Sequence, residues 1–217
     1  RQLAKQPYGM LLITGPTGSG KTTTLYALLH EQHDGQQKII TIEDPVEYQI
    51  KGTLQIPVNE KKGLTFARGL RSILRHDPDK ILVGEIRDHD TAAIAVQAAL
   101  TGHLVYTSVH ANHSLDVIGR FRHMEIDVFG FVSSLNGIVA QRLIRLNCLH
   151  CAKEINPGSE LIEYSGITLA NAKNYIFMQG QGCERCQGTG YKGRQAIAEV
   201  MIIDDELREM MIQGTPI

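Results

Sequence analysis

The fold of this chain is decided by the stretch Gly15-Pro16-Thr17-Gly18-Ser19-Gly20-Lys21-Thr22. It fits the pattern G-x-x-x-x-G-K-[ST], a loop between a strand and a helix that surrounds the phosphates of a nucleotide. Its glycines allow backbone conformations that a Cβ atom forbids, so that N–H groups can face inward. We expect Lys21 to reach the β- and γ-phosphates and the Thr22 hydroxyl to ligate Mg²⁺. The stretch therefore predicts a site for a nucleoside triphosphate.

Short apolar runs alternate with helical stretches on both sides of this loop. The candidate strands are Met10–Thr14, Lys38–Ile42, Ile81–Gly84 and Leu104–Ser108. The candidate helices are Thr22–His30, Phe66–Arg75, Thr91–Leu100 with Asp90 as its N-cap, Leu115–His123 and Phe129–Leu146. This alternation favours an α/β fold, with a parallel-dominated sheet covered on both faces. Together with the loop, it predicts a RecA-like P-loop NTPase core.

Polar groups follow three of these candidate strands. Strand ends converge on the ligand crevice of a doubly wound sheet, so we expect these groups near the loop. Glu43 could hold water on Mg²⁺ or orient the attacking water, and the alternative is a solvated loop. Glu85 is the best candidate to polarise that water, although Gly84 stands where such enzymes usually have a metal-holding aspartate. The alternative for Glu85 is a surface carboxylate.

Histidine and arginine residues give weaker signals. His110 follows the strand Leu104–Ser108 and could sense the γ-phosphate, whereas His103 is expected to be structural. Arg68, Arg71 and Arg75 fall on one helix face, and a solvated basic face is favoured over a phosphate contact.

All four cysteines lie in one part of the chain, as two C-x-x-C pairs: Cys148 with Cys151, and Cys183 with Cys186. Four thiolates in this arrangement suit tetrahedral Zn²⁺, with His150 as a spectator. Disulfides are the alternative, although a nucleotide-dependent enzyme of the cytoplasm sits in a reducing compartment.

The predicted organisation has three parts. These are a RecA-like ATPase core over residues 1–146, a tetracysteine zinc-binding subdomain over 147–193, and a return to the core over 194–217. The last part would contain a strand at Gln195–Ile203 and a helix at Asp204–Gln213.

Composition excludes several classes of protein. The chain has 217 residues and a formal net charge of −1, so it has no basic field to attract nucleic acid or anionic lipid. It has no apolar run long enough to span a membrane, and its first residues lack the apolar core of a signal peptide. A cytoplasmic location is therefore expected.

Taken together, these motifs resemble those of the secretion ATPases of type II secretion and type IV pilus assembly. The resemblance runs through nearly the whole chain. It includes the P-loop, an Asp box at Thr41–Glu47, a Walker B segment from Asp77-Pro78-Asp79 through Ile81–Asp88, a His box at Gly102–Asn112 and the segment Ala140–Arg145. The glycine before Glu85 is similar to what this family has. The tetracysteine lobe resembles the assembly and export branch.

The resemblance implies a function and partners. Lys21 and Thr22 would bind ATP and Mg²⁺, Glu85 would be the general base with Glu43 in support, and His110 would couple the γ-phosphate to subunit motion. The protein would work as a cytoplasmic homo-hexamer, peripheral at the inner membrane. There it would contact a platform protein through a membrane-associated docking partner and drive pilin or pseudopilin assembly.

The resemblance also implies an N-terminal domain that supplies arginines to the nucleotide site, and a closing helical segment. We expect the present chain to bind ATP but to turn it over slowly. Two other functions stay open from the residues alone: a nucleotide-switched scaffold without useful hydrolysis, and a zinc-dependent nucleic-acid-binding module. Net charge opposes the second, so no direct contact with nucleic acid is expected.

Overall fold

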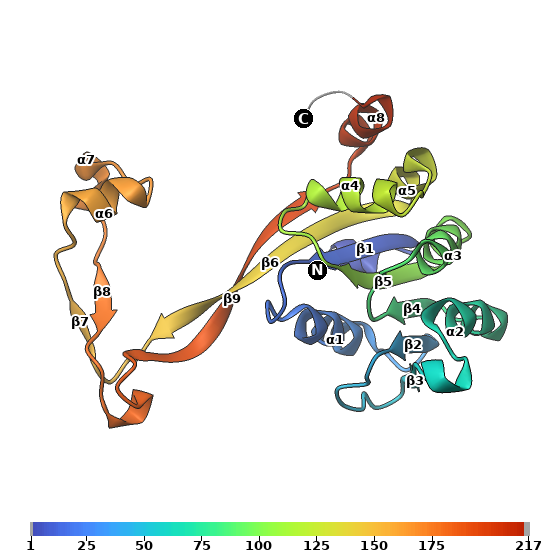
Figure 1. The fold of residues 1–217 in the computed structure, drawn as a ribbon, viewed down its shortest axis with the longest axis horizontal. Coiled ribbons are helices and arrows are strands. Elements are labelled where there is room, and N and C mark those ends of the chain that lie inside the picture. Colours follow the sequence, from blue (N-terminus) through green and yellow to red (C-terminus); the bar gives the residue numbers. More distant parts are fainter. Residues whose placement is uncertain (1, 215–217) are drawn as a thin grey trace. The chain divides into compact units, whose positions relative to one another are not determined.

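The computed structural model describes residues 2–214, which fold into two compact units (Figure 1). Unit 1 takes in residues 2–142 and 198–214 of the described chain, and unit 2 is Leu143–Ile197. Both boundaries fall inside long strands, β6 (Leu135–Asn147) and β9 (Tyr191–Ile202). Two continuous strands therefore lead into and out of the cysteine-bearing unit. Its bounds lie slightly outside the residues 147–193 expected from composition.

Unit 1 is built on a mostly parallel sheet, as predicted. The strand order is β3-β2-β4-β5-β1-β6-β9. Its other strands are β1 (Gly9–Thr14), β2 (Ile39–Glu43), β3 (Leu54–Pro57), β4 (Lys80–Val83) and β5 (Leu104–Val109). Every pair from β3 to β6 is parallel. The carboxyl ends of β1, β2, β4 and β5 therefore lie along one edge of the sheet.

Helices cover both faces of this sheet. They are α1 (Lys21–Gln32), α2 (Phe66–Ile73), α3 (His89–Leu100), α4 (Asp116–His123), α5 (Val128–Ser134) and α8 (Asp205–Gln213). Successive β1 residues point to opposite faces, so Leu11 and Ile13 pack with α1 while Met10 and Leu12 join the larger core beneath α2, α3, α4 and α5. Short 3₁₀ turns occur at Leu3–Lys5, Glu60–Lys62, Leu74–His76 and Glu184–Cys186.

One long helix predicted from the sequence is wrong. Phe129–Leu146 was expected to be helical, but only α5 (Val128–Ser134) is, and the chain then runs on as β6. The strand lies parallel to β1, with Leu11 opposite Gly137 and Ile13 opposite Val139. Pairing with β6 gives hydrogen-bond partners to backbone groups on one side of β1. A helix over the same residues would leave those groups of β1 without these partners. Strand β3 was also missed, since its half-exposed residues carry no apolar run.

The predicted N-cap of α3 is also wrong, by two residues. Asp88 caps this helix: its Oδ1 accepts from Thr91 N at 2.8 Å and its Oδ2 from Thr91 Oγ1 at 2.9 Å. Asp90 instead lies in the first turn and faces Arg71 at 3.8 Å. Arg68, Arg71 and Arg75 are exposed, in line with a solvated basic face.

Unit 2 is small and has little apolar interior. It contains β7 (Ala152–Glu154), α6 (Ser159–Tyr164), α7 (Leu169–Ala172) and β8 (Met178–Gly180), and β7 pairs antiparallel with β8. Of its described residues, Ile162 is the one buried aliphatic side chain, and the other buried apolar groups are the thiols of Cys148 and Cys186. A core of this size is too small to stabilise the unit by itself.

Candidate nucleotide site and cysteine cluster

The P-loop connects β1 to α1, as predicted. Gly15, Gly18 and Gly20 have φ values of 142°, 77° and 86°, a region that favours glycine. Gly15 has no room for a side chain, because a Cβ atom there would lie 2.2 Å from Gln141 O. The loop thus needs glycine at this position both for conformation and for space.

Two polar side chains of the loop have the properties of an anion site. Ser19 is buried, and its Oγ has no hydrogen-bond partner within the described chain. Lys21 Nζ donates to the carbonyl oxygens of Gly15 at 2.9 Å and Pro16 at 3.1 Å, so the loop curls around its ammonium group. Thr22, on the first turn of α1, is exposed. A buried hydroxyl without a partner, a lysine and a helix N-terminus together suit a bound phosphate.

The charge of Lys21 is coupled to Glu85. Partial burial lowers the pKa of Lys21, and the negative charge of Glu85 acts against that shift. Both groups therefore share one electrostatic environment, as expected if the end of β4 faces the P-loop.

Hydrogen bonds tie together the four segments that were expected to converge. Thr14 Oγ1 donates to Val109 O and accepts from Ala111 N, both at 2.9 Å, and so joins the P-loop to the His box. Ser108 Oγ donates to Gly84 O at 2.8 Å, and Gly84 N donates to Ile42 O at 2.8 Å. These bonds fix the ends of β1, β5, β4 and β2 relative to one another.

Glu85 lies directly after β4 and is mostly buried. Its Oε1 pairs with Arg87, and its Oε2 lies 3.5 Å from Nε2 of His110. The structure thus brings together Glu85 and His110, while Arg87 is a partner that the sequence did not point to. Arg87 itself is exposed, and its hydrogen bond to Glu85 is the main cause of its raised pKa.

Glu43 ends β2 and is almost fully buried, with 3% of its surface exposed. Its Oε2 accepts from the hydroxyl of Tyr26, and its Oε1 accepts from Thr41 Oγ1 at 2.5 Å and Gln55 Nε2 at 3.1 Å. Glu43 is thus not the exposed carboxylate of a solvated loop. No local pattern pointed to Tyr26 or Gln55, since one lies within a helix and the other in the unpredicted strand β3.

Gln141 is a further residue that the sequence did not assign. It is buried on β6, donates to Ser19 O at 2.7 Å and accepts from Thr24 Oγ1 at 2.7 Å. It therefore holds the P-loop from the side of the strand that was mistaken for a helix. His103, by contrast, contacts Ala98 O at 3.1 Å, which suits the structural role expected for it.

The four cysteines of unit 2 form one cluster. All four Sγ atoms lie within 4.8 Å of one another, with separations of 3.9 Å for Cys148–Cys183, 3.8 Å for Cys151–Cys186 and 3.7 Å for Cys183–Cys186. Four sulfurs placed about 2.3 Å from a tetrahedral ion would be about 3.8 Å apart. All four thiols are free, so the arrangement suits a metal ion rather than disulfides.

Backbone groups favour the thiolate form of Cys186. Burial alone would raise the pKa of Cys186, but N–H groups of Cys183 and Gly190 donate to its Sγ and help bring the pKa down to about 6. Burial raises the pKa of Cys151 to about 11. His150 contacts Arg185, with Nη1 to Nε2 at 2.8 Å, and is not among the clustered groups.

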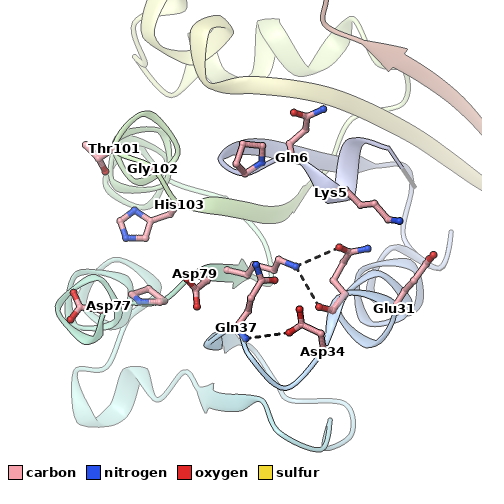
Figure 2. A pocket seen from close by; sticks show the side chains of 14 residues that line it. Lys5, Gln6, Glu31, Asp34, Gln37, Asp77, Asp79, Thr101, Gly102 and His103 are labelled. Atoms are coloured by element: carbon pink, nitrogen blue, oxygen red, sulfur yellow. Dashed lines mark hydrogen bonds between the residues drawn. The ribbon is translucent and has the colours of Figure 1, made fainter.

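A polar pocket of about 710 Å³ lies at the opposite edge of the sheet, where β4 and β5 begin (Figure 2). Asp34, Asp79 and His103 are among its lining residues, together with the buried Lys80, whose Nζ lies 3.4 Å from Gln32 O. Burial lowers the pKa of Lys80, against the charges of Asp34 and Asp79. This pocket is thus separate from the P-loop edge.

Among the described helices, none has the length and apolar character needed to cross a bilayer.

Comparison with known proteins agrees with this geometry. The family model described as "Type II/IV secretion system protein" matches residues 1–216. The chain is 47% identical to the type IV pilus assembly ATPase PilB of Thermus thermophilus over 99% of its length, and 47% identical to the type II secretion system protein E of Dickeya dadantii over 98%. It spans 24% and 42% of those two relatives, so it corresponds to part of each.

Solved structures match the fold as well. The pilus retraction motor PilT with bound ADP superposes with a TM-score of 0.71 and 29% identity, over 98% of this chain and 52% of that one. The Legionella pneumophila ATPase DotB matches with a TM-score of 0.69 and 24% identity, over 99% and 51%. The P-loop and the converging strand ends therefore fit the family whose model matches nearly the whole chain. The chain belongs to the type II/IV secretion system protein family.

Proposed function

We propose that this chain is the ATP-hydrolysing motor domain of a machine that assembles pseudopilins in type II secretion or pilins in type IV pilus biogenesis. The observation that carries the proposal is the position of Glu85. It follows a strand that is hydrogen-bonded into the same edge as the P-loop, and its charge acts on Lys21. The names of the relatives PilB and type II secretion system protein E, and of the structural neighbour PilT, add support.

In this proposal, the backbone N–H groups of Gly15–Thr22 surround the phosphates, and Lys21 contacts the β- and γ-phosphates. The Thr22 hydroxyl would hold Mg²⁺, which would neutralise charge on the phosphate oxygens. Glu85 orients the attacking water and accepts its proton. His110, 3.5 Å from Glu85, would respond to the γ-phosphate and pass that response to β5.

The cysteine cluster is proposed to hold structural Zn²⁺. Four thiolates complete a tetrahedral shell and leave no open position for a reacting water. Because unit 2 has so few buried apolar side chains, the ion would contribute directly to its folding.

The proposed assembly is a homo-hexamer in the cytoplasm, peripheral at the inner membrane. It would act on a platform protein through a membrane-associated partner. The proposed assembly rests on relatives that are named as components of secretion and pilus machines. This chain spans only a part of each of those relatives.

The decisive experiment measures ATP hydrolysis by the full-length protein and by its Glu85→Gln variant. If Glu85 is the general base, the substitution should lower kcat by at least about 100-fold while nucleotide binding changes little. The matched control is Glu206→Gln, at an exposed carboxylate in the first turn of α8, which should leave kcat unchanged. Wild-type turnover no faster than that of Glu85→Gln would instead favour a nucleotide-switched scaffold.

A further inference from the structure

Tyr26 is fully buried on α1, with 1% of its surface exposed, and its hydroxyl lies at the centre of a hydrogen-bond cluster. The hydroxyl donates to Glu43 Oε2 and accepts from Glu47 N at 3.2 Å. Gln55 Nε2 lies 3.1 Å from Glu43 Oε1 and 3.4 Å from the Tyr26 hydroxyl. One phenol therefore connects the helix after the P-loop to the carboxylate at the end of β2.

Helix α1 connects this cluster to Thr22, the residue expected to hold Mg²⁺. Tyr26 is four residues after Thr22 on α1, so the two side chains are neighbours on one helix face, with Cβ atoms about 6 Å apart. Thr22 is exposed at the mouth of the site, whereas Tyr26 lies one turn deeper. A movement of the first turn of α1 would therefore be felt by Glu43 through Tyr26.

The donors also explain how a buried carboxylate is tolerated at this place. Each Glu43 oxygen accepts at least one hydrogen bond, from Tyr26 on one side and from Thr41 and Gln55 on the other. A buried acceptor that loses its donor is destabilised and reorients toward another partner. The direction of the Glu43 carboxylate thus depends on these neighbours.

We infer that Tyr26 and Gln55 are positioning residues, which hold the Glu43 carboxylate in the orientation that supports the Mg²⁺–nucleotide site. The inference rests on the proposed nucleotide function and deepens it. Tyr26 itself is not expected to touch the nucleotide. Its effect on the site passes through Glu43.

Tyr106 offers a matched control on the neighbouring strand β5. It too is fully buried in the core that packs against α1, and its hydroxyl donates to Ala4 O at 2.9 Å, away from the carboxylate cluster. Tyr106→Phe and Tyr26→Phe each delete one buried hydroxyl and keep the ring. Only Tyr26→Phe removes a donor from Glu43.

The test compares the two variants in the full-length protein, with a fluorescent ATP analogue and a Mg²⁺ titration. Tyr26→Phe should raise the Mg²⁺ concentration for half-maximal analogue binding several-fold and lower kcat about tenfold, with KM within twofold of wild type. Tyr106→Phe should change each value less than twofold. Gln55→Ala, at a partly exposed strand, should shift the Mg²⁺ midpoint in the same direction and tests the inference if Tyr26→Phe does not fold.

A double variant separates positioning from general damage. In the Glu43→Gln background, adding Tyr26→Phe should change neither the Mg²⁺ midpoint nor kcat any further. Equal Mg²⁺ midpoints for wild type, Tyr26→Phe and Gln55→Ala would overturn the inference. A wild-type protein that binds the analogue without hydrolysing ATP would contradict the proposed function, and the Mg²⁺ midpoints would still decide the inference.

Discussion

The nucleotide edge of unit 1 and the cysteine cluster of unit 2 are held in place by different means. At the nucleotide edge, the buried side chains of Thr14, Gln141 and Glu43 all have hydrogen-bond partners. The sheet that carries them packs against a large apolar core. At the cluster, four thiols converge in a unit with very few buried apolar side chains.

The two sites differ in what supplies the folding free energy that stabilises them. Packing of the sheet and its helices fixes the P-loop before any ligand binds. The cysteine sulfur atoms, by contrast, contact backbone N–H donors and one another. No large apolar core of described residues packs against them. Ligand removal should therefore leave unit 1 folded, whereas loss of the metal should unfold unit 2.

The largest expected effect is that of metal removal. Cys148→Ser, or a chelator selective for Zn²⁺ over Mg²⁺, should unfold unit 2, because metal binding contributes on the order of 10 kcal/mol to folding of such small sites. Limited proteolysis should then cut within Leu143–Ile197, while analogue binding by unit 1 persists. His150→Ala is the matched control and should keep both the metal and protease resistance. An intact unit 2 without bound metal would contradict the comparison.

The next effect concerns the P-loop backbone. Gly15→Ala places a Cβ atom 2.2 Å from Gln141 O and should cost about 3 kcal/mol of stability and abolish analogue binding. Gly18→Ala is the control: its φ is also positive, at 77°, but no atom lies within 4 Å of the added Cβ. It should cost only about 1–2 kcal/mol. Equal losses in chemical denaturation would show that space at Gly15 is not the constraint.

The smallest effect is an alkaline loss of stability in unit 1. Burial raises the pKa of Tyr26 and Tyr106 above the value of about 10 in an unfolded chain. Their contribution is therefore complete below pH of about 10 and is lost as pH rises further, because the unfolded state releases protons first. Unfolding midpoints between pH 9 and 11 should fall less steeply in Tyr26→Phe and Tyr106→Phe. Identical slopes in both variants and wild type would contradict this.

Much of unit 1 could be predicted from the sequence because local signals and tertiary structure agree there. The P-loop glycines, the apolar runs of β1, β4 and β5, and the polar residues after them all point to one sheet edge. The pairs Cys148/Cys151 and Cys183/Cys186 likewise predicted a cluster that the geometry bears out.

The errors lie where distant partners decide the local structure. Residues 135–146 have a pattern that also fits a helix, and β6 forms because β1 offers an edge with unpaired backbone groups. The contacts of Tyr26 with Glu43 and of Gln141 with Ser19 join segments 17 and 122 residues apart. No local pattern marks such pairs, so the partners of the predicted site residues became known only from the structure.

The most direct test of the central claim is Mg²⁺-dependent binding of a fluorescent ATP analogue to this chain, with Lys21→Ala beside wild type. Binding should require Mg²⁺ and fall at least about 100-fold in the variant, while both proteins unfold at similar denaturant concentrations. Equal binding by wild type and Lys21→Ala would contradict the proposed nucleotide site, as would a wild-type chain and full-length protein that both fail to bind.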